Sequence, residues 1–156
     1  MNFLAHAYLS FDHPGIIVGN MIADFVKGSL PLINYPKPVQ YGIRLHRAID
    51  EFTDQHPATR EAASFFKKDY RLYSAVFIDV VYDHFLANDI NYFPPGALFH
   101  FSQQVYTVLQ LNHEVLPPFF RQLFYYMQSQ NWLLGYQQQE GAGKAFKGII
   151  RRAKYL

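Results

Sequence analysis

The sequence predicts an all-helical fold in a single compact domain that covers residues 1–156. A chain of 156 residues is the size of one ordinary domain. Prolines and glycines divide it into segments of helical length. Within these segments apolar residues recur at spacings of three and four residues, as on one face of a helix. No window of useful length alternates strictly between apolar and polar residues, as a half-buried strand does. With half of its residues hydrophobic and 18% aromatic, the chain does not have the composition of a disordered protein.

The first third of the chain contains three expected helices, over residues 2–10, 15–27 and 38–55. The pair Pro14-Gly15 separates the first two. Pro38 stands where a first-turn proline belongs, since such a proline gives up no helical hydrogen bond. Segment 30–37 contains two prolines and is expected to be an irregular loop.

Five further helices are expected in the remainder, over residues 58–69, 73–88, 97–113, 117–131 and 140–154. The start at 58 is the least defined: with Thr59 as N-cap, a capping box would need Glu or Gln at position 62, where Ala62 stands. Segment 89–96, with its Pro-Pro-Gly end, is expected to be a second loop.

Composition excludes several kinds of chemistry. The absence of cysteine rules out disulfides, thiolate zinc sites and cysteine nucleophiles, so any metal must be held by His, Asp, Glu or Asn. Such ligands suit Mn²⁺, Mg²⁺ or Fe²⁺. The sequence has no glycine-rich phosphate loop, GxSxG elbow or HExxH motif, which leaves metal-activated water as the expected chemistry.

Charge and hydropathy limit the partners and the location. A net charge of +2 is too small to indicate nucleic acid, but it is compatible with an acidic protein partner. No signal peptide is recognisable, and the apolar runs are far shorter than the roughly 20 residues that span a membrane. We therefore expect a cytoplasmic protein without a membrane span.

Two carboxylates share one face of the helix expected at 72–87. Asp79 and Asp83 are four residues apart and hence about 40° apart around the axis. Apolar side chains cover nearly every other direction, so this helix is expected to be central and buried. Buried acids on one stripe repel each other and need a cation, a proton or strong donors. A metal ion is the simplest partner, and an arginine from elsewhere in the fold is the alternative.

A second polar stripe runs along the helix expected at 38–55. His46, Asp50 and Asp54 recur every four residues beside an apolar stripe. A histidine and an aspartate at this spacing can bind one ion, whereas the alternative is an ordinary solvated helix face.

Three more residues are candidates for the metal site or for catalysis, and each has apolar or acidic neighbours in the sequence. His6 and Asp24 are each flanked by apolar residues in the first third of the chain. His84 follows Asp83 directly and points about 100° away from it, as a group that orients a ligand or acts as a base would. The remaining histidines are near turns and segment ends and are expected at the surface: His13, His56, His100 and His113.

Five motifs in order resemble one protein family. They are MNFLAH at 1–6, GNMIADFVKG at 19–28, IRLHRAIDEFTD at 43–54, DVVYDHFLA at 79–87 and QNWLLGY at 130–136. Together they resemble the bacterial acyl carrier protein phosphodiesterases, also called holo-acyl-carrier-protein hydrolases. The resemblance runs from Met1 to about Arg152, and five motifs in sequence make it specific although none is decisive alone.

The resemblance implies an HD-phosphohydrolase-like helical enzyme that hydrolyses the phosphodiester between 4′-phosphopantetheine and a serine of acyl carrier protein. The implied cofactor is a divalent metal, Mn²⁺ first, with Mg²⁺ or Fe²⁺ possible. The implied metal positions are His6, Asp24, His46, Asp50, Asp79 and Asp83. The implied catalytic positions are Asp24, His46 and His84, and the resemblance does not divide these positions between ligand and base.

The chain departs from the family pattern at two points. Its adjacent pair is Asp83-His84, whereas HD enzymes have His before Asp. The chain also stops at Leu156, while family members continue for some tens of residues, so either a C-terminally short variant or a truncated product is expected.

An acidic protein substrate implies a basic docking patch. One candidate patch is Lys67, Lys68 and Arg71, and the other is Lys144, Lys147, Arg151, Arg152 and Lys154. The alternative for both is ordinary solvated helix charge.

Two other functions stay open at this point. One is an HD-like phosphohydrolase acting on a nucleotide or small phosphoester, which activity on nucleotides without activity on holo-acyl carrier protein would select. The other is a catalytically inactive helical binding module, which absence of bound metal would favour.

Overall fold

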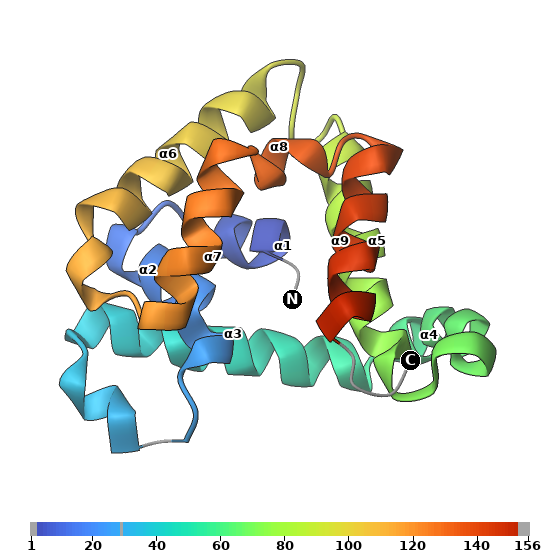
Figure 1. The fold of residues 1–156 in the computed structure, drawn as a ribbon, viewed down its shortest axis with the longest axis horizontal. Helices are drawn as coiled ribbons and strands as arrows, with labels where there is room; N and C mark the ends of the chain where they lie inside the picture. The colour runs from blue at the N-terminus through green and yellow to red at the C-terminus, as the bar shows by residue number, and fades with distance from the viewer. Residues whose placement is uncertain (1–2, 29, 153–156) are drawn as a thin grey trace.

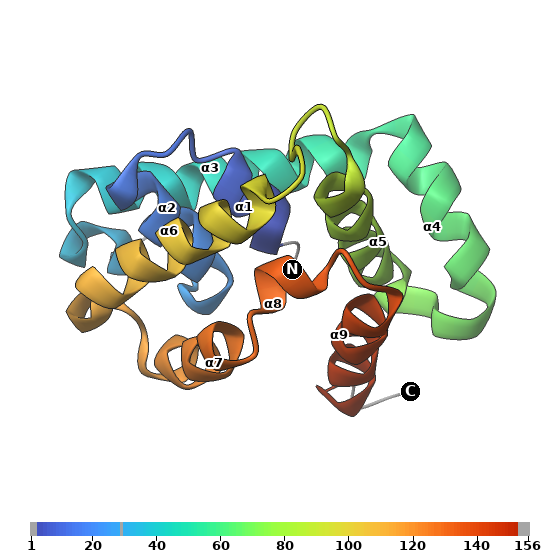
Figure 2. The same cartoon turned by 90° about the horizontal axis from the view of Figure 1, so that it is seen from above.

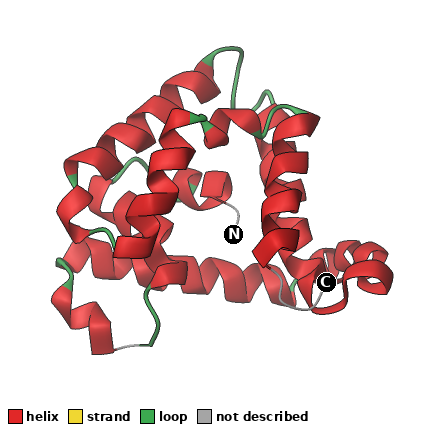
Figure 3. Cartoon of the chain, in the orientation of Figure 1, coloured by secondary structure: helices red, strands yellow, loops and turns green. Residues whose placement is uncertain are grey.

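The computed structural model describes residues 3–28 and 30–152, and this part of the chain contains helices and no strand (Figure 3). Its α-helices are α1 (Phe3–Tyr8), α2 (Pro14–Ile22), α3 (Lys37–Gln55), α4 (Pro57–Tyr70), α5 (Ser74–Asn88), α6 (Ala97–Leu111), α7 (Pro118–Ser129), α8 (Trp132–Gly135) and α9 (Gln139–Arg152). Short 3₁₀ turns are η1 (Ala23–Phe25), η2 (Leu30–Asn34), η3 (Arg71–Tyr73) and η4 (His113–Val115). The predicted all-helical fold is confirmed.

The second helix ends earlier than the sequence pattern indicates. The expected helix over 15–27 stops at Ile22, tightens into η1 and becomes extended at Val26. Gly28 then has φ of +77°, a conformation that glycine adopts without strain. Asp24 therefore lies on a tight turn beyond the helix, where its direction is not that of an α-helical residue.

Two exposed histidines begin helices. The His13 side chain accepts a hydrogen bond from the Ile16 amide at 3.5 Å, and the His56 side chain accepts one from the Ala58 amide at 3.3 Å. Each satisfies one of the amide groups that a helix start leaves unpaired. The helix expected at 58–69 thus starts at Pro57 with His56 as its N-cap, and Thr59 does not cap it.

Helices α2 and α3 form the most extensive helix pair of the described chain, because two glycines let their backbones touch. A Cβ atom added to Gly19 would lie 2.8 Å from the Cα of Gly42, and one added to Gly42 would lie 2.8 Å from the Cα of Gly19. No side chain larger than hydrogen fits at this crossing. The last turn of α2 is thereby held against the second turn of α3.

Helix α3 runs along one edge of the fold, with α4 beyond its far end (Figures 1 and 2). Helix α2 packs on α3, and α1 and α6 both contact α2. Helix α5 contacts α1 on one side, with α4 and α9 on others. The buried apolar core takes most of its side chains from α1, α2, α6 and α7, and fewer from α3 and α5.

Helix α5 is only partly buried, so the prediction of burial on all sides is wrong. Phe77 and Val80 are buried, but the Phe85 ring is exposed. The reason is that α1, α4 and α9 leave one side of α5 uncovered, and an apolar pattern cannot specify how many neighbours a helix receives. In the described chain no helix is both long enough and apolar enough to cross a membrane.

Candidate metal centre

The orientation of His46 is fixed by the end of α2. Its Nδ1 lies 2.7 Å from the backbone oxygen of Asn20, a carbonyl in the last turn of α2. The last carbonyls of a helix lack helical donors, so this oxygen is available to accept. Since a carbonyl only accepts, Nδ1 carries the proton and donates it. The other ring nitrogen, Nε2, is therefore the one that faces the site.

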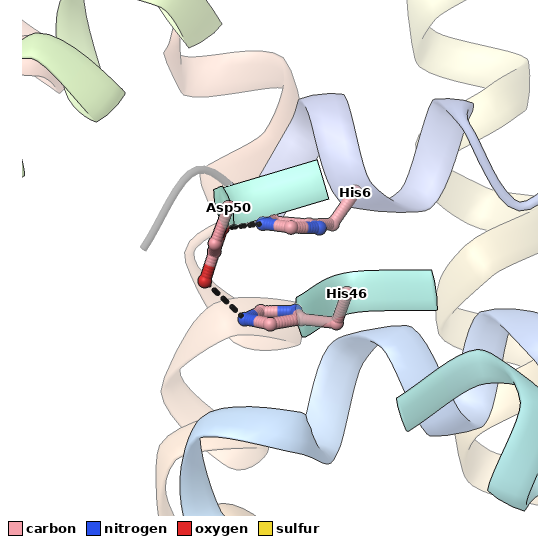
Figure 4. A group of neighbouring side chains, drawn as sticks. All are labelled: His6, His46 and Asp50. Carbon is pink, nitrogen blue, oxygen red and sulfur yellow. Dashed lines mark hydrogen bonds and ion pairs between the residues drawn. The ribbon is translucent and has the colours of Figure 1, made fainter. Parts of the chain in front are cut away.

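Two carboxylates meet this nitrogen. His46 Nε2 lies 3.2 Å from Asp24 Oδ1 and 3.2 Å from Asp50 Oδ2. Asp50 is one turn further along α3, and its other oxygen lies 3.1 Å from Nε2 of His6 on α1. Figure 4 shows both imidazole rings pointing toward Asp50 from neighbouring helices. The polar stripe expected on residues 38–55 thus faces another chain segment and is not simply a solvated face.

The histidines are buried and the carboxylates reach solvent. The side chains of His6 and His46 are 2% and 6% exposed, whereas those of Asp50 and Asp24 are 44% and 36% exposed. The group therefore has an enclosed imidazole side and an open carboxylate side, from which a substrate can approach.

The electrostatics of the group place a proton where a cation would bind. Burial alone would lower the pKa of His46, but hydrogen bonds to Asp24 and Asp50 outweigh burial and raise this pKa to about 9. Burial likewise would raise the pKa of Asp50, but hydrogen bonds from His46 and His6 hold it well below its usual value. The pKa of Asp24 is lowered too, by His46, against the effect of burial. Without a metal, a shared positive charge thus sits among two ionised carboxylates.

The donor set fits a divalent metal. One ligand atom each from His6, His46 and Asp50 lie within 4.8 Å of one another. Imidazole nitrogens with carboxylate oxygens suit a borderline divalent ion, and the Asn20 carbonyl on Nδ1 of His46 is the kind of partner that orients a ligating histidine. Nδ1 of His6 is buried and has no hydrogen-bonding partner among the described residues, so His6 lacks a contact like that of His46 Nδ1 with Asn20.

Asp83 is engaged elsewhere. It is fully buried, and its two oxygens accept hydrogen bonds from the backbone amides of Leu4 at 3.0 Å and Ala5 at 2.9 Å. Burial raises its pKa to about 7, although both amide hydrogen bonds act in the opposite direction. The expected strong donors are therefore present, and they are backbone N–H groups at the start of α1 in place of an arginine.

Asp79 lies on the same face of α5, nearer to the site. Its pKa is raised, first by burial and then by the carboxylates of Asp50 and Asp54. Asp79 therefore interacts electrostatically with Asp50 and Asp54. Its membership of the ligand set stays a prediction.

His84 is directed away from this group, toward Tyr136. Its Nδ1 lies 2.6 Å from the backbone oxygen of Tyr136, to which it donates. The ring lines a pocket of about 260 Å³ together with Val81, Ala142 and Phe146. No contact among the described residues links His84 to His6, His46 or Asp50.

Sequence reasoning missed one polar contact beside the site. The Arg47 guanidinium donates to the backbone oxygens of Val26 at 3.0 Å and Gly28 at 2.9 Å, and so ties the turn after Asp24 to α3. No motif signals such a contact, because its acceptors are backbone atoms.

Both candidate basic patches are exposed where the structure describes them. Lys67, Lys68 and Arg71 are exposed, as are Lys144 and Lys147 on α9. The side chains of Arg151 and Arg152, and Lys154 as a whole, lie outside the described part.

Comparison with known proteins assigns the family. Over residues 1–156 the sequence matches the family described as acyl carrier protein phosphodiesterase. The chain belongs to this family.

Curated members of the acyl carrier protein phosphodiesterase family agree along the whole chain. The chain is 35% identical to the acyl carrier protein phosphodiesterase of Yersinia pestis, over 100% of this chain and 81% of that protein. It is 34% identical to that of Photorhabdus laumondii, over 97% of this chain and 77% of that protein. It is also 34% identical to the Escherichia coli protein of the same name, over 100% of this chain and 81% of that protein. The resemblance drawn from the five motifs is confirmed.

No solved structure is similar enough to be matched. The relationship to HD phosphohydrolases therefore stays a prediction, while the acyl carrier protein phosphodiesterase family is established by sequence and the all-helical fold by the structure.

Proposed function

We propose that the chain hydrolyses the phosphodiester that joins 4′-phosphopantetheine to a serine of holo-acyl carrier protein, with a divalent metal ion, Mn²⁺ first. The observation that carries the proposal is the convergence of His6, His46 and Asp50 in a chain whose relatives are named acyl carrier protein phosphodiesterases. A helical binding module without catalysis is the alternative, and it predicts no turnover and no change on adding Mn²⁺.

In this proposal His6, His46 and Asp50 hold the ion and Asp24 completes the set. A bound divalent ion lowers the pKa of a coordinated water and neutralises phosphate charge. His46 contributes only Nε2, because Nδ1 is committed to Asn20. His46 therefore has no second nitrogen with which to move a proton, and the earlier catalytic role for it becomes that of a ligand.

Asp24 is the residue proposed to accept a proton during the reaction. In the metal-free protein His46 lowers the pKa of Asp24 against the effect of burial, so the carboxylate is ionised at neutral pH before the ion binds. It is also partly exposed, as a group that touches substrate must be. In the reaction the water oxygen forms a bond to phosphorus, the bond from phosphorus to the serine oxygen breaks, and the serine oxygen takes up a proton. The products are 4′-phosphopantetheine and apo-acyl carrier protein.

The proposed partner is acyl carrier protein, an acidic protein of the cytoplasm, which is where the chain is then expected. The exposed cations on α4 and α9 are the candidate docking groups: Lys67, Lys68, Lys144 and Lys147. Opposite charge would steer the encounter, so turnover should fall as salt rises.

The test is mass spectrometry of holo-acyl carrier protein incubated with the chain and Mn²⁺. Loss of the phosphopantetheine mass is expected, and chelator should abolish it. His46→Ala should also abolish it, whereas His100→Ala, which alters an exposed histidine on α6, should not. Turnover of nucleotides with none of holo-acyl carrier protein would refute the proposal and select the nucleotide phosphohydrolase.

A further inference from the structure

The helix that carries His6 is too short to be stable alone. Helix α1 contains six residues, Phe3 to Tyr8. Isolated helices shorter than about 12 residues are marginal in water, because the first turn costs more conformational entropy than its hydrogen bonds return. The direction of the His6 ring must therefore be set by contacts between α1 and the rest of the fold.

Asp83 makes the contact at the start of this helix. The amides of Leu4 and Ala5 belong to the first turn, whose N–H groups have no helical acceptors. Both donate to the Asp83 carboxylate, at 3.0 and 2.9 Å, across 79 and 78 positions of sequence. A negative group at a helix N-terminus is favoured by the helix dipole as well. A side chain of α5 thus does for α1 what an N-cap residue ordinarily does from the same helix.

The other end of α1 is held by α2. The His6 backbone oxygen accepts hydrogen bonds from Asn20 Nδ2 at 2.8 Å and from Ser10 Oγ at 2.8 Å. His6 is therefore fixed between a cap from α5 and an amide from α2. Asn20 serves both histidines, since its backbone oxygen receives His46.

We propose that Asp83 is a positioning residue for His6, acting through the first turn of α1, and is not a ligand of the metal. The proposal deepens the proposed function, because it gives Asp83 a role in assembling the metal site. Tyr136 supports the carboxylate from the side of α8, with its buried hydroxyl hydrogen-bonded to Asp83. Each Asp83 oxygen accepts a backbone amide of α1, while the His6 ring meets Asp50.

The decisive variant is Asp83→Asn, which keeps the shape of the side chain. Its NH₂ group replaces one acceptor oxygen, so one of the two backbone N–H groups loses its hydrogen bond. Mn²⁺ affinity should fall about 10- to 100-fold, the range typical of groups that orient metal ligands. The same substitution in a His6→Ala background should then cost nothing further, because the residue that Asp83 positions is gone. Losses that multiply in the double variant would show that Asp83 binds the metal itself and would overturn the proposal.

A purely structural role gives a different result. In that case Asp83→Asn lowers Tm but leaves Mn²⁺ affinity unchanged at temperatures where the variant is folded, which would also overturn the proposal. Tyr106→Phe is the matched control for lost stability: it removes a buried hydroxyl that bonds Asn131 and the Leu133 amide, on the α6 side of the fold. It should lower Tm without changing Mn²⁺ affinity.

A readout without metal separates this proposal from the proposed function. In ¹⁵N-histidine spectra of the metal-free protein, Asp83→Asn should shift the His6 ring signals and leave those of His100 in place. An unchanged His6 would refute positioning, whatever the substrate proves to be. Should Asp83→Asn fail to fold, Ala5→Pro is the second variant, since it deletes one donor N–H in the first helical turn, where proline is tolerated. It should shift the same His6 signals.

Discussion

The imidazole rings of His6 and His46 are stacked, with centroids 3.8 Å apart and 11° between their planes. Each directs Nε2 to a different oxygen of Asp50. Two imidazolium rings at this distance would repel each other, and the exposed carboxylates offset this only in part. The pair is therefore best satisfied either by a positive charge on one ring only or by a single cation between the nitrogens and Asp50.

Metal uptake should release a proton. With the pKa of His46 raised to about 9, Nε2 is protonated at pH 7.5 and must lose that proton to bind an ion. Calorimetry in buffers of different protonation enthalpy should give a release close to one proton at pH 7.5. Mn²⁺ affinity should rise roughly tenfold per pH unit up to about pH 9, as mass action requires for one displaced proton. An affinity independent of pH would contradict this, and His46→Ala should lose most of the proton release.

The metal-free protein should lose stability as pH rises. His46 has a folded pKa of about 9 against an ordinary value of 6.5, so its contribution is complete below pH 6.5 and is lost as pH rises through 9. The shift corresponds to at most about 3 kcal/mol in the free energy of unfolding, shared with Asp24 and Asp50 because they form one coupled group. Urea melts in chelator at pH 6.5 and pH 9 measure it. His46→Gln should reduce the difference in the free energy of unfolding between the two pH values. A wild-type protein that is more stable at pH 9 than at pH 6.5 would contradict this prediction.

Asp24→Ala should separate metal binding from folding. Asp24 pairs with His46 and with no arginine among the described residues, and its side chain is 36% exposed. Removal should therefore change the Tm little in chelator, since Asp50 still pairs with His46. The increase in Tm that Mn²⁺ gives should shrink, and turnover should be lost. A variant that is far less stable in chelator yet keeps the full Mn²⁺ increment would make Asp24 structural.

Arg47→Met should lower turnover more than stability. The guanidinium holds the turn after Asp24 through Val26 and Gly28, at the solvent edge of the fold. Hydrogen bonds of this kind contribute about 1 kcal/mol to folding, but loss of the tether lets Asp24 move. We expect kcat to fall on the order of tenfold, since small displacements of a reacting group are costly. Arg44→Met is the control, because Arg44 is exposed and has no hydrogen bond or ion pair among the described residues. Equal kcat for both variants would remove this role from Arg47.

Local patterns predicted the helices well and the partners of individual side chains poorly. The i,i+4 spacing of His46 and Asp50 gave their shared face, which the structure retains. The same spacing on α5 put Asp79 and Asp83 together but could not reveal that Asp83 meets two backbone amides 78 and 79 positions away. Backbone acceptors such as the Asn20 carbonyl have no sequence signature at all, since every residue possesses one. His6 and Asp24 became candidates through their apolar flanks, and the family resemblance then placed both among the implied metal positions.

The close crossing of α2 and α3 should control both stability and metal binding. In Gly19→Ala the new methyl group would lie 2.8 Å from Gly42 Cα and from the Ile43 amide nitrogen, which are backbone atoms that cannot rotate away. The helices must separate, at a cost of about 1–3 kcal/mol or more in the free energy of unfolding. Asn20 follows Gly19 directly, so the same separation pulls its carbonyl from His46 Nδ1, now 2.7 Å away.

Gly143→Ala is the control for this crossing, because a Cβ there has nothing within 4 Å and lies inside α9. It should leave Mn²⁺ affinity unchanged and raise stability by up to about 1 kcal/mol, since alanine is the better helix former. Urea melts and Mn²⁺ titrations of both variants give the comparison. If Gly19→Ala is destabilised but binds Mn²⁺ as tightly as the wild type while folded, the crossing serves the fold alone and the Asn20 carbonyl is not what orients His46.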